Sequence, residues 1–172
     1  MKTLLLLSLL FGAAFAKVLV SPVEAMQENF SPDAKIIKKN ILLHSKQAHA
    51  IQNRAKVKLG TKIYRTYKAL KNGKVKGYGI LINKKVRSKN AVVLYIIKDD
   101  VLTDIEIIAF NEPTEFMPTK GWLEQFKARP TDKNLTLNRD IPTVTGATLS
   151  ARVMTDGSRV AFALYNEVLQ GK

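Results

Sequence analysis

Hydroxyl side chains gather in one short segment, residues 143–150, which reads Thr-Val-Thr-Gly-Ala-Thr-Leu-Ser. An apolar pattern with helical spacing follows it, so the segment is predicted to open a helix. The first amides of a helix lack intrahelical acceptors and the helix dipole makes this end positive, so an anion such as phosphate is favoured there. Gly146 permits a tight turn, and Thr148 sets a hydroxyl beside the phosphate site. An ordinary helix start capped by Thr or Ser would use the same residues.

The residues around this segment form a pattern typical of one protein family. Residues 62–169 contain, in order, predicted hairpins, the stretch Glu-Pro-Thr-Glu-Phe-Met-Pro at 112–118, Trp122 and then Thr-Gly-Ala-Thr-Leu-Ser at the start of the last helix. This arrangement resembles the FMN-binding domain family. That family includes the C subunit of the sodium-pumping NADH:quinone reductase, the G subunit of the Rnf complex and small exported flavoproteins.

The resemblance implies a covalent cofactor. In the family, a dedicated transferase uses FAD and a divalent metal to bond FMN through its phosphate to the last Thr of the motif. Carried over, Thr148 is the attachment site, Thr145, Gly146 and Ala147 shape the turn, and Leu149 and Ser150 lead into the helix. One position departs from the family pattern. The place three residues before Thr145, where the family usually has Asp, holds Pro142, and Asp140 is the nearest acid.

Side chains outside the motif have two interpretations each. Phe116, Met117 and Trp122 could pack against the isoalloxazine ring, or could form ordinary core under a sheet. Glu112 and Glu115 could serve the flavin site, although exposed salt bridges are the expected role for both.

Other cofactor chemistry finds little support. The chain has no cysteine, which excludes disulfides, thiolate metal sites, c-type haem attachment and thiolate-bound iron–sulfur clusters. His44 and His49 would lie on different faces of a helix, so no metal site is expected from them. Neither a Ser/His/Asp set nor a Walker or dinucleotide-type glycine loop is present.

Charge is divided unevenly along the chain. The net charge is +14, and residues 17–90 carry 18 Lys/Arg against three Asp/Glu, whereas residues 91–172 carry nine against 11. Such a basic half would attract phosphate, anionic lipid or an acidic protein. Nucleic acid is not expected as a partner, because the basic stretch has no helix-turn-helix or RNA-binding signature. Residues 1–16 read as a secretory signal cleaved after Ala16, and the alternative is an uncleaved anchor. The signal predicts a periplasmic or otherwise extracytoplasmic protein, either free or at the membrane surface.

The remaining pattern predicts an α+β fold, in which a largely antiparallel sheet packs with helices and a C-terminal amphipathic helix follows the attachment turn. Residues 17–57 are assigned to a basic, partly helical N-terminal segment and 58–172 to the FMN-binding domain. Four strands are expected at 62–70, 75–82, 92–97 and 102–110, with an Asn-Gly hairpin at 72–73. Helices are expected at 22–29, from a Ser45 cap to 57, at 121–126 and at 149–169. Residues 34–43 fit neither period, and 128–140 read as a polar loop.

Together these features predict an exported FMN-carrying electron carrier rather than a complete enzyme. A membrane redox protein or a haem protein would be its electron partner. The alternative is a non-redox exported module that holds an anionic lipid, a polymer or an acidic partner through its basic half. A self-contained FMN-dependent reductase would need an acid/base group that the sequence does not reveal.

Overall fold

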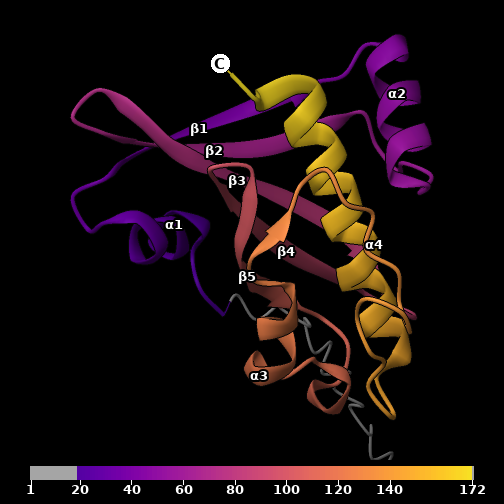
Figure 1. The fold of residues 1–172 in the computed structure, drawn as a ribbon. Coiled ribbons are helices and arrows are strands. Elements are labelled where there is room, and N and C mark those ends of the chain that lie inside the picture. Colours follow the sequence, from indigo (N-terminus) through magenta and orange to yellow (C-terminus); the bar gives the residue numbers. More distant parts are fainter. Residues whose placement is uncertain (1–18, 172) are drawn as a thin grey trace, which may run out of the picture.

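A computed structural model describes residues 19–171 and shows an antiparallel sheet in which neighbouring strands follow one another along the chain (Figure 1). The predicted α+β class is therefore confirmed. The six strands, in sheet order, are β1 (Lys35–Leu42), β2 (Ile63–Lys71), β3 (Lys74–Lys85), β4 (Asn90–Lys98), β5 (Val101–Phe110) and β6 (Arg129–Pro130).

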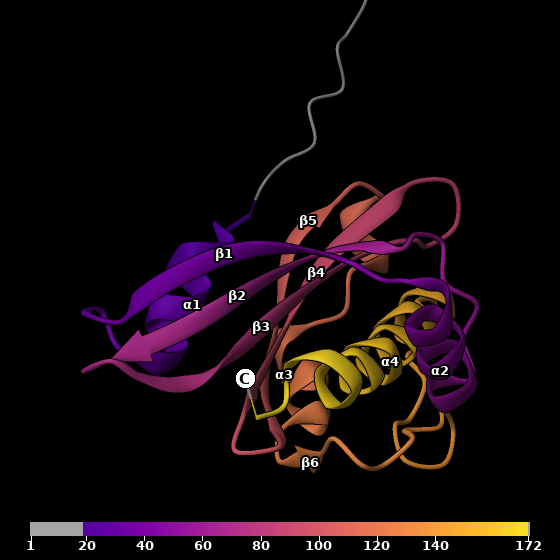
Figure 2. The same ribbon diagram turned by 90° about the horizontal axis from the view of Figure 1, so that it is seen from above.

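Helices cover both faces of the sheet. Figure 2 shows α1 (Pro22–Phe30) on one side, with α2 (Ser45–Ala55) and α4 (Thr148–Leu164) together on the other. A π-helical turn, Tyr165–Leu169, continues α4. The short helix α3 (Lys120–Leu123) and the 3-10 turns Thr114–Phe116 and Glu124–Phe126 lie between β5 and β6. No helix within residues 19–171 is long and apolar enough to cross a bilayer.

Strand β4 is buried on both faces, as its continuous apolar run predicts. Val93, Tyr95 and Ile97 join the core under α2 and α4. Leu94 and Ile96 join the smaller core under α1. Because successive side chains of a strand point to opposite faces of the sheet, β4 contributes residues to both cores.

Helix α1 packs closely because β3 carries glycine where the helix crosses it. A Cβ at Gly79 would lie 2.5 Å from the Met26 sulfur, and one at Gly77 would lie 2.6 Å from the Phe30 ring. The pairing of β2 with β3 also shifts register between Ala69 and Leu70, which places a bulge on β3 next to Gly77. Glycine inside a strand is typical of such a bulge and of a close approach by a neighbouring element.

The sequence pattern missed two strands. Within the ambiguous stretch 34–43, Lys35–Leu42 form β1, an edge strand with one neighbour. Several of its apolar residues are exposed, with Ile37 40% and Leu42 73% exposed. The burial that creates a clear period is therefore lacking. The predicted polar loop 128–140 contains β6, whose two residues are too few for any pattern.

One helix prediction needs correction. The N-cap of α2 is His44, not Ser45, and it forms a capping box with Gln47.

Helix α4 begins at Thr148 and is amphipathic, as predicted. Arg152, Asp156 and Arg159 lie along its partly exposed side, whereas Val153, Gly157, Val160, Ala161 and Leu164 are buried. Two of its buried hydroxyls are satisfied within the helix: Thr155 Oγ1 donates to the Ala151 carbonyl at 2.9 Å, and Ser158 Oγ donates to the Thr155 carbonyl at 2.7 Å.

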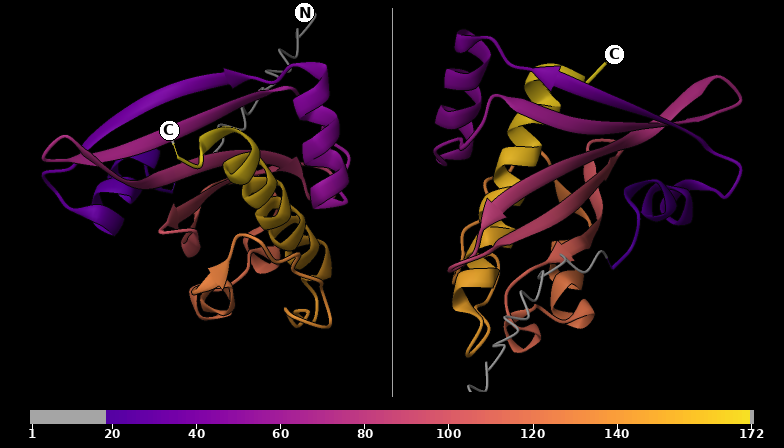
Figure 3. Two further views of the ribbon diagram at one scale, coloured as in Figure 1. Left: turned by 45° about the horizontal axis from the view of Figure 1, so that its top comes forward. Right: turned by 180° about the vertical axis from the view of Figure 1, so that it is seen from behind.

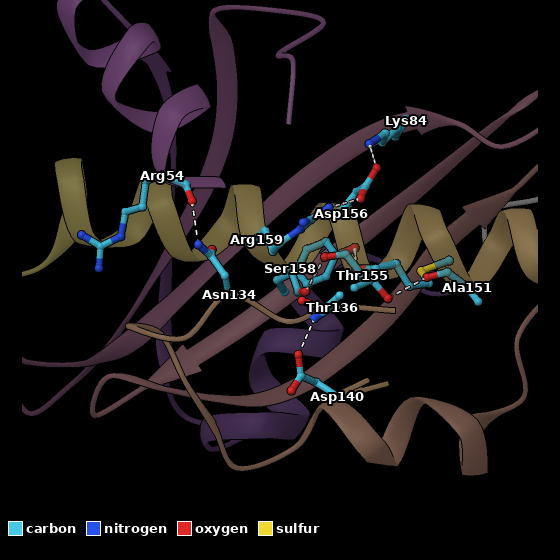
Figure 4. Close-up of polar contacts among 12 residues, drawn as sticks. Arg54, Lys84, Asn134, Thr136, Asp140, Ala151, Thr155, Asp156, Ser158 and Arg159 are labelled. Atoms are coloured by element: carbon cyan, nitrogen blue, oxygen red, sulfur yellow. Dashed lines mark hydrogen bonds and ion pairs between the residues drawn. The ribbon is translucent and has the colours of Figure 1, made fainter. Parts of the chain in front are cut away.

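A half-buried ion-pair group ties α4 to β3. Figure 4 shows Asp156 between Lys84 of β3 and Arg159 of α4, and the Lys84 nitrogen lies 2.6 Å from the Asp156 carboxylate. Helix α2 packs against α4 on the same side of the sheet, as the tilted view in Figure 3 shows. The residues 35–55 that form β1 and α2 share the sheet and the main core with the rest of the chain. The predicted secretory signal lies outside the described residues.

Candidate functional site

A hollow of about 190 Å³ opens at the start of α4. Its lining comes from three separate parts of the chain: Val86 and Arg87, then Glu112 and Phe116, then Gly146, Ala147, Thr148, Leu149 and Ser150. Five of the eight predicted site residues therefore meet in one place. Thr145, Glu115 and Trp122 do not line it.

The turn before α4 leaves the helix start open. Gly146 has φ +80°, in the left-handed region where glycine is favoured, and the Ala147 amide donates to the Val144 carbonyl at 3.0 Å. The N-cap residue is Ala147, and no side chain caps the helix. The alternative of a helix start capped by Thr or Ser is therefore wrong, and the first-turn amides are available to an anion.

The Thr148 hydroxyl is accessible. The side chain is exposed, and its Oγ1 makes one long hydrogen bond, 3.4 Å, to the Val144 carbonyl oxygen. A bond of that length is weak and is readily exchanged for another partner. The hydroxyl that the resemblance marks for attachment thus lies at the mouth of the hollow, beside the uncapped helix start.

Ser150 provides a second, independent indication of a binding site in the hollow. The residue is 1% exposed, it lines the hollow, and its Oγ has no hydrogen-bond partner within the described part of the chain. A buried hydroxyl without a partner costs about 1–3 kcal/mol. An oxyanion in the hollow would offer this hydroxyl an acceptor.

Glu112 holds the opposite wall and contradicts its predicted role as an exposed salt bridge. It is 6% exposed, and its Oε1 accepts the backbone amides of Arg87, Ser88 and Lys89 at 3.0, 2.6 and 2.7 Å. These bonds, with that from the Lys89 amide foremost, lower the pKa of Glu112 to about 2. The carboxylate fixes the loop between β3 and β4 and so places Arg87 at the hollow.

The other predicted residues near the motif have different positions relative to the hollow. Phe116 is half-buried and lines the hollow, whereas Met117 lines a larger cavity of about 540 Å³ beside α3. Trp122 packs edge-on against Phe126, and its indole nitrogen donates to the Pro142 carbonyl at 3.0 Å. Trp122 therefore holds the loop that leads to the motif rather than facing the hollow. Glu115 is exposed and makes no ion pair with any residue in the range 19–171.

Asp140, the acid nearest to the motif, braces its own loop. It accepts the Thr136 amide at 2.7 Å, as Figure 4 shows. It also pairs with Arg139 at 3.2 Å. The Thr136 amide is the main reason why the pKa of Asp140 lies below its usual value. The Asp140 carboxylate therefore already has bonding partners, and Asp140 does not line the hollow.

Sequence reasoning did not find Val86 or Arg87, which lie about 60 residues from the motif along the chain. Their loop carries no motif, and its anchor is a set of backbone amides, which have no sequence signature. No protein-family model matches this chain, and a search of curated proteins finds no similar protein.

Proposed function

We propose that the protein is an extracytoplasmic flavoprotein that carries FMN, bonded through its phosphate to Thr148, and that it acts in electron transfer. The main support is the exposed Thr148 hydroxyl at an uncapped helix start, next to the buried and unpartnered Ser150 hydroxyl. The resemblance of the motif to the FMN-binding domain family adds to it.

The residues present fit the phosphate end of FMN. The first-turn amides of α4 and the helix dipole favour an anion, the Ser150 hydroxyl can donate to it, and Arg87 adds a positive charge at the lining. The hollow, at about 190 Å³, is smaller than the roughly 300–1,000 Å³ of sites that enclose whole ligands. The hollow therefore suits the phosphate, and the rest of the cofactor would extend beyond it, where a partner protein could reach it.

Attachment by a transferase would be a phosphoryl-type transfer from FAD. The Thr148 oxygen would form a new bond to the phosphorus of the FMN half. The bond from that phosphorus to the AMP half would break, AMP would depart with the bridging oxygen and the electron pair, and the hydroxyl proton would be released to solvent. The chain's own contribution is to present Thr148 on an exposed turn and to neutralise the phosphate once it is attached. Bound FMN supplies reversible electron uptake, and the protein supplies its attachment and orientation.

The experiment is co-expression of the full chain with an FMN transferase, followed by mass spectrometry of the denatured protein. We expect the mass of one bonded FMN in the wild type and in Thr148→Ser, and its loss in Thr148→Val. Thr143→Val, which changes an exposed Thr of the same loop outside the Thr-Gly-Ala-Thr motif, is the matched control and should keep the flavin.

Two outcomes would refute the proposal in different ways. Flavin retained in Thr148→Val would move the attachment to another residue. Wild-type protein without flavin, bonded or bound, that still binds vesicles of phosphatidylglycerol would favour the non-redox module with a basic binding surface.

A further inference from the structure

Three exposed cations lie on the loop and the helix that contribute to the lining of the hollow. Arg87 lines it, Lys89 ends the same loop, and Arg152 lies one helical turn beyond Thr148 on α4. All three side chains are exposed, and in the described part of the chain none of them pairs with a carboxylate. The acid in the lining, Glu112, is buried and already bound by backbone amides. Glu115, next to the lining residue Phe116, is exposed, so the three cations face one exposed carboxylate and the surface around the hollow carries an excess of positive charge.

An apolar side chain lies among these charges. Leu149 lines the hollow and is 44% exposed, which is unusual for a large aliphatic residue in a helix that is otherwise almost wholly buried. An apolar centre with a charged rim is the general anatomy of a protein interface. This arrangement points to a protein-binding surface around Thr148.

We propose that this surface, made by Arg87, Lys89, Arg152 and Leu149, docks an acidic redox protein. The inference rests on the proposed function, because it places the partner against the site where FMN would be attached. Two copies of this chain could not dock here through the same surface, since like charges would face one another. An anionic membrane is the less suitable occupant, because one exposed leucine gives little apolar area for insertion.

The expected complex is weak and governed by charge. Redox proteins bind one another through small interfaces. Complementary charges raise their association rate, and this effect falls as the ionic strength rises. The basic N-terminal half adds long-range attraction, but the three cations around the hollow (Arg87, Lys89 and Arg152, called the rim cations) determine where the partner binds. Exchanging the three rim cations should therefore weaken binding more than exchanging three cations elsewhere.

The test measures binding by calorimetry, using full-length protein with and without flavin. The probe is cytochrome c with succinylated lysines, which makes a haem protein acidic, and native basic cytochrome c is the comparison. The rim variant is Arg87→Gln, Lys89→Gln, Arg152→Gln. The matched control is Lys35→Gln, Lys74→Gln, Lys76→Gln, which removes the same charge from exposed residues of β1 and of the hairpin joining β2 to β3.

We expect the wild type to bind only the succinylated probe, and the rim variant to bind it about tenfold more weakly at low salt, with the control changed by less than about threefold. Equal losses in both variants, or binding to phosphatidylglycerol vesicles but not to the probe, would overturn the docking surface. Binding is also measured on flavin-free protein. Absence of FMN would therefore refute the proposed function, while the docking surface would still be tested by the binding of the probe. Unchanged thermal unfolding of both variants would confirm that each is folded.

Discussion

Replacing Gly157 with Ala tests how tightly α4 is seated on the sheet. Gly157 lies in the middle of α4 against Tyr95 of β4, whose hydroxyl donates to the Met154 carbonyl at 3.0 Å. An added Cβ would lie 2.0 Å from the Tyr95 hydroxyl oxygen and 2.7 Å from the ring carbon that bears it. Tyr95 is completely buried, so it has little room to move away.

Opposing contributions to the free energy of unfolding decide whether Gly157→Ala stabilises or destabilises the protein. Ala is favoured over Gly inside a helix by about 1 kcal/mol. Overpacking a core costs about 1–3 kcal/mol, and displacing the Tyr95 hydroxyl would also lose a hydrogen bond worth about 1 kcal/mol. The free energy of unfolding should therefore fall by about 1–3 kcal/mol, which for a chain of this size lowers Tm by roughly 2–12 °C.

The assay is urea and thermal unfolding followed by circular dichroism. Gly121→Ala is the control, because Gly121 is also helical but has no atom within 4 Å of an added Cβ, so the change should be neutral or stabilising. Combining Gly157→Ala with Tyr95→Phe removes the nearest clashing atom and should cost less than the sum of the single changes. A Gly157→Ala protein that is more stable than the wild type would refute the close contact.

Two further predictions concern the supports of the hollow. The folded pKa of Glu112 is about 2, below its ordinary 4.5, so its carboxylate stabilises the fold fully above about pH 4.5 and progressively less as the pH falls toward 2. Urea unfolding across this pH window should show a shallower loss in Glu112→Gln, together with faster amide exchange at residues 87–89; identical pH profiles would contradict the role of the carboxylate. Trp122→Phe keeps the ring contact with Phe126 but removes the bond to the Pro142 carbonyl. We expect faster amide exchange in residues 140–147 and less complete flavin attachment, and exchange equal to the wild type would show that this bond does not hold the loop.

Local patterns in the sequence determined most of the elements. The Asn72–Gly73 turn has positive φ at both residues, as a tight hairpin requires. The apolar run of β4 predicted burial on both faces, and the hydroxyl-rich segment predicted a helix from 149, one residue from the observed start at Thr148. These signals lie within a few residues of the structure they specify, so the sequence alone was sufficient to place them.

Tertiary structure alone decided what surrounds Thr148 and what buries α4. Arg87 and Glu112 meet the motif because antiparallel pairing of β3, β4 and β5 places their ends together. Glu112 is held by backbone amides, which every loop possesses, so no residue type announces the contact. The burial of α4 likewise depends on α2 and on the sheet, since the helix's own pattern predicts which side is buried but not which elements cover it.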